Sequence, residues 1–496
     1  MIPSPPPARA ARKTALAEAD AAIAADASAA APRFVRARLL TELGRTDEAR
    51  QAYMDLLAIA PDHAGALNNL GSLLAETGYR TAARLVYEQA IARHPDQTMA
   101  RINLGNLALE DGESEAAKEH YLAALALEPD NAEAHRGLAY ALDEEGDAEA
   151  AARHRRQGFA GRAVTALPYR GEGPPVEVLL LISAAGGNVR TAPLLDDRTF
   201  AVTAVAAEFL AEDEPLPSHA VVFNAIGDAD RCGPALDAAE RILRRSGRPV
   251  VNRVAAVRDS GRREVAERLA ALPGVVAPKT VALPREAIAA GRAPSLLAEG
   301  GLAFPLLLRS PGFHTGRHFV RVAAAEELDG ALAALPGGEL VAIAFLDGRG
   351  ADGLYRKYRA MFVDGDIYPL HLAVSPNWKI HYFSAAMADR PDLRDEEAAY
   401  LNNMESVLGA AGTQALARVR DCLGLDYGGI DFGIGADGRL LLFEANATMA
   451  VVAPDADPRW DYRRPHIARV IEATRRMVLS RAGKADPAIG HEPHLI

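Results

Sequence analysis

Hydrophobic and polar positions repeat along the first third of the chain with a period of 34 residues. Within each unit, the spacing of the apolar positions predicts two amphipathic helices joined by a turn. A glycine falls in the turn, where φ can be positive, and a proline ends the second helix. Between these positions, an alanine lets the paired helices approach closely, and an aromatic side chain fills the space between units. These positions are Gly44, Gly78, Gly112 and Gly146; Ala49, Ala83, Ala117 and Ala151; Tyr53, Tyr87 and Tyr121; and Pro61, Pro95 and Pro129.

The pattern predicts complete units at about 31–63, 64–97 and 98–131, and a fourth at about 132–162. The fourth unit has Arg155 in the aromatic position and lacks the closing proline, as is typical of a capping unit. Residues 1–30 form an N-terminal tail, in which 11–30 predict one further helix. The recurring positions resemble the tetratricopeptide repeat, which implies an all-α solenoid of helix–turn–helix units.

The first helices of stacked repeats line a concave groove, which implies a docking surface for a peptide or protein partner. Asn68, Asn69, Asn103 and Asn106 fall on these helices, and asparagine side chains can pair with a peptide backbone. Solvated helix surface is the alternative interpretation of these asparagines. Self-association or a spacer role is the alternative for the whole array.

A proline- and glycine-rich stretch, residues 163–175, predicts a linker and a domain boundary. Apolar runs at 176–182, 200–205, 219–224 and 249–252, with a helical pattern at 234–246, then predict a small parallel α/β layer. Gly186 and Gly187 follow the first strand without completing a dinucleotide fingerprint. A loop packing near a substrate is therefore favoured over NAD binding.

Residues 427–446 predict a β-hairpin, because Asp437-Gly438 is a strong signal for a two-residue turn with positive φ at both positions. Side chains alternate between the two faces of a strand, so Asn446 lies on the same face as Glu444. The predicted register places three pairs opposite one another, Ala436 and Arg439, Phe432 and Phe443, and Asp431 and Glu444.

Facing carboxylates about 4.5–5.5 Å apart at Cβ repel each other, and a hard cation between them removes the repulsion. Mg²⁺ takes oxygen ligands and shares them with substrate phosphates, so the hairpin predicts a metal–nucleotide site. A surface hairpin with two solvated acids is the alternative. It is weakened by strongly apolar neighbours that place the acids at the edge of a core, namely Ile430, Phe432, Leu442 and Phe443.

Cations and glycines precede this hairpin. Residues 304–309 predict a strand that ends in Arg309, followed by a loop with Gly312 and Gly316. A glycine loop can cover phosphates with backbone N–H groups, although this one lacks the Walker ending. Lys357 and Arg359 lie in a cationic segment that leads into a further strand and a turn at 364–366.

Residues 176–480 resemble the ATP-grasp superfamily of ligases, in the order of a small α/β domain, a lobe with a cationic strand and glycine loop, and a lobe with a metal hairpin. The segment 359–365 and Asp431 with Glu444-Ala445-Asn446 resemble most the glutathione-synthetase-like and ribosomal-protein-modifying ligases. The resemblance implies a multidomain chain, in which the repeat solenoid precedes an α/β pre-ATP-grasp domain at 176–280 and an α+β ATP-grasp domain at 281–480. Residues 481–496 are a C-terminal tail.

The resemblance also implies roles for individual residues. Asp431, Glu444 and Asn446 would bind Mg²⁺ or Mn²⁺. Arg309 stands in the place of a phosphate-binding lysine, and Arg359 lies near the transferred phosphate or the substrate carboxylate. The remaining implied contacts with ATP are Gly312, Gly316, Lys357, and Phe345 and Leu346 of the adenine hinge; Arg262 is a further candidate for phosphate, and His371, Trp378 and His381 are candidates for the acceptor pocket, with a structural role as the alternative.

The implied activity is that of an ATP- and Mg-dependent ligase. It would activate a small-molecule or peptide carboxylate as an acyl phosphate and join it to an amine, while the repeats dock a peptide or protein. The alternatives are a non-catalytic repeat adaptor with a nucleotide-sensing fold, and a kinase on the same fold.

The composition indicates which partners and which cellular compartment suit this chain. The 496 residues carry a net charge of −11, which argues against nucleic acid as a partner. The two cysteines, Cys232 and Cys422, suit a reducing compartment and exclude a disulfide framework. No apolar run is long enough for a membrane span, and acidic residues interrupt the alanine-rich N-terminus, so a cytoplasmic location without a membrane partner is expected.

Overall fold

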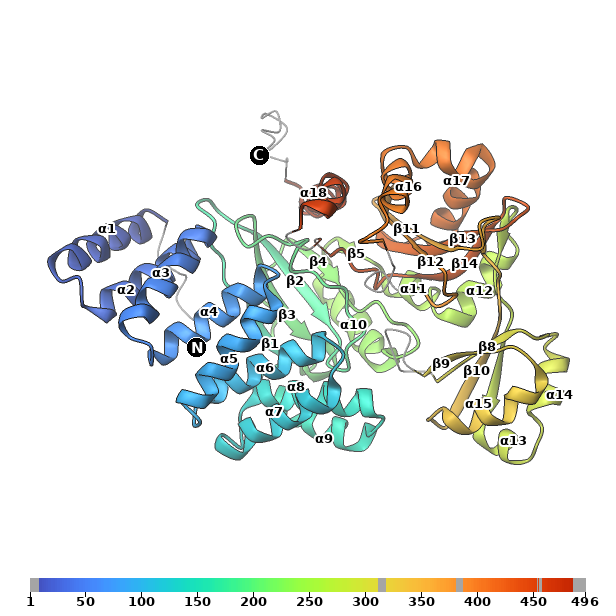
Figure 1. Cartoon of the computed structure of the whole chain (residues 1–496), viewed down its shortest axis with the longest axis horizontal. Coiled ribbons are helices and arrows are strands. Elements are labelled where there is room, and N and C mark those ends of the chain that lie inside the picture. Colours follow the sequence, from blue (N-terminus) through green and yellow to red (C-terminus); the bar gives the residue numbers. More distant parts are fainter. Residues whose placement is uncertain (1–8, 311–317, 381–386, 453, 455–456, 485–496) are drawn as a thin grey trace. The chain divides into compact units, whose positions relative to one another are not determined.

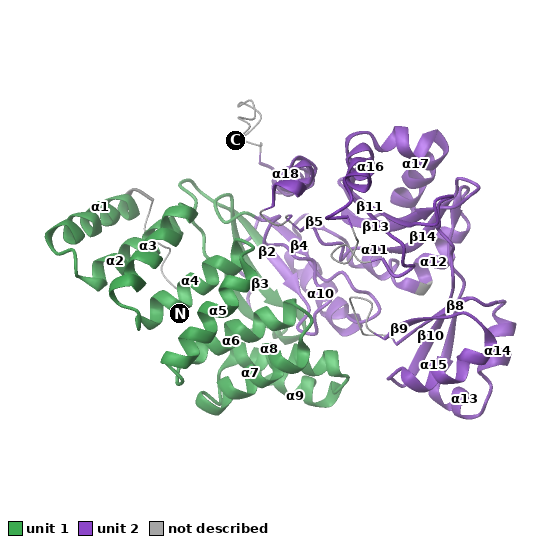
Figure 2. Ribbon diagram, in the orientation of Figure 1, with its two compact units in different colours: residues 1–178, 196–214 green, residues 179–195, 215–496 purple. Residues whose placement is uncertain are grey.

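The computed structural model describes residues 9–310, 318–380, 387–452, 454 and 457–484. Contacts divide the chain into two compact units (Figure 2). Unit 1 comprises residues 1–178 and 196–214, and unit 2 comprises residues 179–195 and 215–496. The boundary falls within strand β2 (Val176–Ile182). Among the described residues, no helix combines the length and the apolar character that crossing a membrane requires.

Unit 1 is built mainly from helical pairs that follow the predicted period (Figure 1). The first helices of the pairs begin at residues 30, 64, 98 and 132, and the second helices begin at 46, 80, 114 and 148. A further helix precedes them, in the segment where the sequence predicts one. The helices are α1 (Arg9–Ala25), α2 (Ala30–Glu42), α3 (Thr46–Ile59), α4 (Ala64–Glu76), α5 (Arg80–Arg93), α6 (Thr98–Glu110), α7 (Ser114–Leu127), α8 (Ala132–Glu145) and α9 (Ala148–Phe159).

The recurring residues have the local roles that the sequence predicts. Gly78 and Gly112 lie between paired helices with φ of 85° and 80°, a conformation that strains other residues. Tyr121 is fully buried, and its ring lies 2.9 Å from the position that a Cβ at Gly105 would take, so the small residue makes room for the aromatic one. In the fourth pair, Arg155 replaces the aromatic side chain and forms an ion pair with Asp143 at 2.7 Å.

The rest of unit 1 corrects the predicted linker. Residues 164–166 do not form a bare connection but the strand β1 (Val164–Ala166), which pairs antiparallel with β3 (Phe200–Ala206). The β-branched residues Val164 and Thr165 favour this extended pairing. A short 3₁₀ turn, η1 (Ala207–Phe209), follows β3.

Unit 2 begins with a small α/β layer. Strand β4 (Val221–Asn224) pairs parallel with β5 (Val250–Val251), and helix α10 (Gly233–Ser246) connects them. Helices α11 (Val254–Arg258) and α12 (Arg262–Ala270) follow.

Two mixed or antiparallel sheets complete unit 2 (Figure 1). The first has the strand order β7-β10-β8-β9 and is antiparallel. The second has the order β12-β11-β13-β14-β6, with only β6 parallel to its neighbour. Their elements are β6 (Val275–Val276), β7 (Thr280–Pro284), α13 (Arg285–Ala289), α14 (Ala293–Glu299), β8 (Leu306–Arg309), β9 (Phe319–Val322), η2 (Ala325–Glu327), α15 (Leu328–Ala334), β10 (Glu339–Ala344), β11 (Tyr355–Val363), β12 (Asp366–Ser375), α16 (Pro391–Asn402), α17 (Met404–Leu423), β13 (Tyr427–Ile434), β14 (Leu440–Asn446), η3 (Pro458–Arg463) and α18 (Arg464–Arg481).

A buried asparagine joins the α/β layer to the second sheet. Asn252 donates from Nδ2 to the Tyr427 carbonyl at 2.8 Å and accepts from the Tyr427 N–H at Oδ1 at 2.9 Å. Its carbonyl accepts from Asn224, and its N–H donates to Asp426. The φ of Asn252 is 62°, which asparagine tolerates better than other residues with a Cβ. The start of β13 is thereby held against the end of β5.

Asn252→Ala is expected to destabilise unit 2 by about 3 kcal/mol, because Tyr427 loses two partners inside the core and alanine tolerates positive φ poorly. Asn252→Gly removes the same hydrogen bonds without the conformational cost, so its stability should lie between those of the wild type and the alanine variant. The two tryptophans, Trp378 and Trp460, belong to unit 2. Urea unfolding followed by tryptophan fluorescence therefore measures this unit, and wild-type stability in both variants would contradict the role of the amide.

Candidate functional site

Four side chains from the sequence-predicted site form one row across the second sheet. The strand register places His371 of β12 opposite Arg359 of β11, Arg359 opposite Asp431 of β13, and Asp431 opposite Glu444 of β14. The predicted pairing of the two acids is therefore confirmed. Arg359 and Asp431 form a cross-strand pair of opposite charges, whereas Asp431 and Glu444 are like charges on adjacent strands.

The turn that produces this register differs from the predicted one. The Gly435 N–H donates to the Arg439 carbonyl, and only Gly438 has positive φ, so the loop has three residues rather than two. Asp437 accepts from the Arg439 N–H and so stabilises the longer loop with its own side chain. The predicted pairing of Ala436 with Arg439 is wrong for this reason.

A β-bulge cancels the shift that the longer loop introduces. Phe432 lies opposite Leu442 rather than Phe443, and the register changes between Asp431 and Phe432. The extra residue, Phe443, is 39 % exposed, and its ring lies beside Gly433, where a Cβ would come within 2.8 Å. The predicted pairing of Phe432 with Phe443 is wrong, but the two departures together restore the pairing of the acids.

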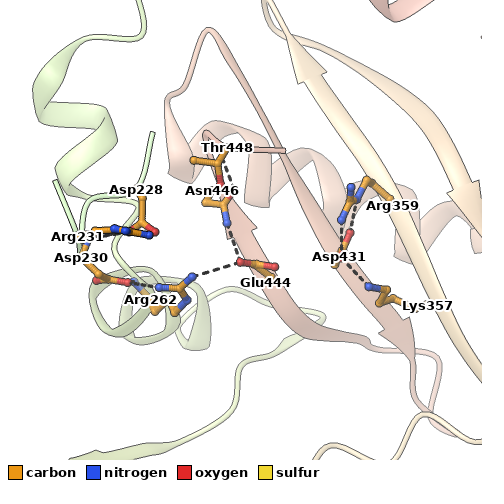
Figure 3. Close-up of polar contacts among 10 residues, drawn as sticks. All are labelled: Asp228, Asp230, Arg231, Arg262, Lys357, Arg359, Asp431, Glu444, Asn446 and Thr448. Atoms are coloured by element: carbon orange, nitrogen blue, oxygen red, sulfur yellow. Dashed lines mark hydrogen bonds and ion pairs between the residues drawn. The ribbon is translucent and has the colours of Figure 1, made fainter. Parts of the chain in front are cut away.

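Asp431 is buried and contacts two cations (Figure 3). Its Oδ1 accepts from Nε of Arg359 at 2.6 Å, and its Oδ2 accepts from Nη2 of Arg359 at 2.9 Å and lies 3.0 Å from Nζ of Lys357. Burial alone would raise the pKa of Asp431, but Arg359 and Lys357 hold that pKa well below its ordinary value. Asp431 is therefore a permanent anion that fixes both cations in place.

Glu444 lies on the other side of the row and is partly exposed. Its Oε1 accepts from Asn446 Nδ2 at 2.9 Å and lies 3.7 Å from Nη2 of Arg262. The Oδ1 of Asn446 in turn accepts from the N–H and the hydroxyl of Thr448, both at 2.9 Å. Glu444 and Asn446 are thus brought together, as the sequence predicts.

Two arginines converge on this acidic side of the site. Arg262 begins α12 and contacts Asp230 at 2.9 Å, and although burial opposes its charge, Glu444, Asp228 and Asp230 raise its pKa. Arg309 ends β8, and burial, with the nearby positive charge of Arg262, lowers its pKa. The charge of Arg309 is therefore disfavoured in this position, and a further anion beside it would stabilise that charge.

Asp228 and Asp230 were not predicted from the sequence. They lie in the loop after β4, which packs on the segment after β14, since a Cβ at Gly227 would meet Thr448 at 2.7 Å. Asp228 is 8 % exposed, and its Oδ1 accepts the N–H groups of Asp230 and Arg231. Among the described residues, Oδ2 of Asp228 has no hydrogen-bond or ion-pair partner. The available signal was an acidic loop at the carboxyl end of a parallel strand, where ligands commonly bind.

Other predicted residues are packed rather than open. Phe345 is half-buried, with the guanidinium of Arg321 over its ring at 4.6 Å and Trp378 edge-on at 6.3 Å. His371 is buried inside the sheet, and this burial, followed by the charge of Arg359, lowers its pKa well below the usual range. His371 thus does not line an open acceptor pocket. Leu346 follows Phe345 and is also half-buried; Gly312, Gly316 and His381 lie outside the described residues.

Oxygen ligands for a metal ion are present, but several already have partners. Within the part of the chain that the structure describes, no group of three or more histidine, cysteine, aspartate or glutamate side chains could hold a metal ion. The side chain of Glu444 is 38 % exposed and, with Asn446, fits a hard cation that prefers oxygen. Asp431 could join them only if Arg359 or Lys357 releases one of its oxygens.

Comparison with known proteins identifies the helical region. Residues 34–98, 68–117 and 102–154 match the family described as tetratricopeptide repeat. The helical pairs of unit 1 are tetratricopeptide repeats. No relative was found among curated proteins.

Similar solved structures overlap about a third of the chain. They include MamA from Desulfovibrio magneticus RS-1, with 22 % identity, 30 % of this chain and 85 % of that chain covered, and a TM-score of 0.28. They also include pilF of Pseudomonas aeruginosa, with 22 % identity, 30 % and 68 % covered and a TM-score of 0.29, and YrrB, with 20 % identity, 30 % and 76 % covered and a TM-score of 0.27. Scores this low carry no argument about the function of the chain.

Asp431→Asn is expected to lower the free energy of unfolding of unit 2 by about 3 kcal/mol near neutral pH, because Arg359 and Lys357 then remain buried without their carboxylate. The folded-state pKa of Asp431 lies below its unfolded value near 3.9, so its stabilisation is complete above that value and is lost as the pH falls. The difference between wild type and variant should stay constant at neutral and alkaline pH and shrink below about pH 4.

Urea unfolding followed by tryptophan fluorescence over a pH series measures this difference. Asp395→Asn, which removes an exposed carboxylate from α16, is the control and should change stability little. A difference that widens toward acidic pH would contradict the assignment of Asp431 as the permanent anion.

Proposed function

We propose that unit 2 is an ATP- and Mg-dependent ligase of the ATP-grasp type, which activates a carboxylate and joins it to an amine. The observation that carries the proposal is the facing pair Asp431 and Glu444 within a set of cations from three separate elements. Such a mixture of fixed acids and cations suits a metal–polyphosphate substrate, because phosphoryl transfer depends mainly on positioning and charge stabilisation.

Arg262 and Arg309 are the proposed phosphate contacts. Burial and the charge of Arg262 disfavour the charge of Arg309 in the free protein, and an anionic phosphate beside Arg309 would reduce that cost. A bound Mg²⁺ or Mn²⁺ held by Glu444 and Asn446, joined by Asp431, would neutralise phosphate charge. Phe443, exposed beside the charged row, and Leu346 are the proposed contacts for the adenine base.

The remaining charged residues suit the acyl-transfer step. The substrate carboxylate would attack the γ-phosphate, ADP would leave, and the resulting acyl phosphate would lie near Arg359 and Lys357, whose positions Asp431 fixes. An incoming amine must lose a proton as it displaces phosphate. Asp228 is the proposed acceptor of that proton, because it is buried beside the arginines and its Oδ2 has no partner among the described residues.

The tetratricopeptide repeats are proposed to dock a peptide or protein partner. Their asparagines are partly used within the array, since Asn103 donates to Asn68 at 3.0 Å and Asn106 accepts from the Tyr121 hydroxyl at 2.6 Å. Asn69 also contacts Tyr53 at 3.3 Å. These bonds link neighbouring helices and would hold the first helices in a fixed arrangement for docking.

Mg·ATP is expected to raise the melting temperature of the wild-type protein, whereas ATP with EDTA should do so much less. Glu444→Gln keeps the size of the side chain but removes the charge that would hold the metal, so the Mg-dependent part of the shift should disappear. Glu405→Gln, which neutralises an exposed acid on α17, is the matched control and should respond like the wild type. A full Mg-dependent shift in Glu444→Gln would contradict the metal site.

Ligase activity is tested by incubating the protein with Mg·ATP, a panel of carboxylates and hydroxylamine, which captures an acyl phosphate as a hydroxamate. We expect ATP-dependent hydroxamate and stoichiometric phosphate release, and a loss of about 100-fold in kcat/KM for Arg309→Gln. Arg349→Gln removes an arginine exposed outside the site and is the control. A stable phosphorylated product that forms without any hydroxamate would indicate a kinase instead. The enzymatic proposal would be rejected if no acceptor gave an ATP-dependent product.

A further inference from the structure

A charged cavity lies in unit 1, away from the residues assigned above. It has a volume of about 70 Å³ and is lined by residues from α1, the end of α2, the segment before β2 and the segment before β3. A water molecule takes about 30 Å³ in the liquid, so the cavity has room for a small polar group. Its lining residues are Arg12, Glu42, Leu43, Arg170, Gly171, Glu172 and Arg198.

Arg12 is the buried cation of this cavity. Its side chain is 3 % exposed, and its Nε lies 3.3 Å from Oε2 of Glu42 without forming a hydrogen bond to it or to any other described residue. Glu42 is also shared, since Arg38 approaches its other oxygen at 3.6 Å. A buried guanidinium with an unsatisfied N–H calls for a further acceptor, such as a bound ion or water.

Two further guanidinium groups face the cavity with most of their donors available. Arg198 donates from Nη2 to the Leu43 carbonyl at 3.2 Å, and Arg170 contacts Asp197 at 2.9 Å. Among the described residues, these are the only hydrogen bond of the Arg198 guanidinium and the only ion pair of the Arg170 guanidinium. Because a guanidinium carries five N–H donors, the three arginines together offer many more donors than the protein accepts.

The wall of the cavity is closely built. A Cβ at Gly171 would lie 2.2 Å from the backbone oxygen of Arg198, so the segment can approach this backbone only with glycine. The Tyr169 hydroxyl donates to the Gly173 carbonyl at 2.7 Å and closes the segment on itself. Arg198 also fills the space that a side chain at Gly44 would occupy. The arginines are thus held around a defined space.

We propose that this cavity binds a small oxyanion, a phosphate or a carboxylate group, through Arg12, Arg170 and Arg198. When Asp197, which pairs with Arg170, and Arg38, which lies against Glu42, are included, four guanidinium groups face three carboxylates, so one positive charge is in excess. Planar guanidinium groups match both kinds of oxyanion with paired hydrogen bonds. The bound anion would tie α1 and the end of α2 to the segments before β2 and β3.

The test is calorimetric titration of the full chain with inorganic phosphate and, separately, acetate, at constant ionic strength set with chloride. All titrations use an Arg309→Gln background, so that the arginines of unit 2 contribute less to the signal. If phosphate binds and acetate does not, the ligand is a phosphate or phosphoryl group. If acetate binds as well, the cavity also accepts a carboxylate group.

Two variants with opposite expected effects on anion affinity make the test specific. Arg198→Gln, at an exposed side chain, should weaken the binding about tenfold, which corresponds to about 1.4 kcal/mol. Glu42→Gln removes a competing carboxylate and should strengthen it. Arg153→Gln makes the same change of net charge on the exposed surface of α9 and should leave the affinity unchanged. Absence of binding by both anions, or equal binding by the Arg198 and Arg153 variants, would overturn the proposal.

Discussion

The contact between Asp431 and Arg359 is the interaction on which the charged half of unit 2 depends. A carboxylate with almost no exposure is tolerated in a sheet only when cations satisfy both of its oxygens, and Arg359 and Lys357 do so from a single neighbouring strand. The opposite face of the same strands is aromatic, with Tyr358 stacked on Phe432 at 5.3 Å. The packing of this aromatic face therefore holds the strands that carry the charged side chains in place.

The surrounding cations reach this layer from other elements, and their positions follow from how those elements are anchored. Arg262 starts a helix whose first N–H faces Asp230, and Arg309 ends a strand in the neighbouring sheet. Asn252 holds the start of β13 through two hydrogen bonds to the backbone of Tyr427. Residues far apart in sequence thus meet at one place because several backbone segments are fixed independently.

The sequence predicts most of what depends on local spacing. The 34-residue period places the helices of unit 1 because each repeat uses the same turn glycine and the same buried aromatic position. The two Asp-Gly turns show the limit of local rules: Asp364-Gly365 has positive φ at both residues, as expected, whereas Asp437 does not. A side-chain bond from Asp437 to Arg439 selects the longer loop, and no pattern of apolar residues reports such a bond.

Tertiary proximity is the part that the sequence does not predict. Asp228 comes beside Arg262 and Arg309 only because its loop packs on the segment after β14, and Phe345 is covered by Arg321 from the next-but-one strand of its sheet. Neither relation leaves a periodic signal. The predicted pairing of Asp431 with Glu444 is correct although the predicted two-residue turn is not, because the bulge at Phe443 compensates for the extra residue in the loop.

That offset restricts how the protein can change. Exposed hairpin tips usually accept insertions and deletions freely. Here, removing one residue from the tip while keeping the bulge would slide β14 by one position and send the Glu444 carboxylate to the opposite face of the sheet. Length variation at this tip is therefore compatible with the charged row only when a second, compensating change occurs at residue 443, so the two positions are expected to vary together or not at all.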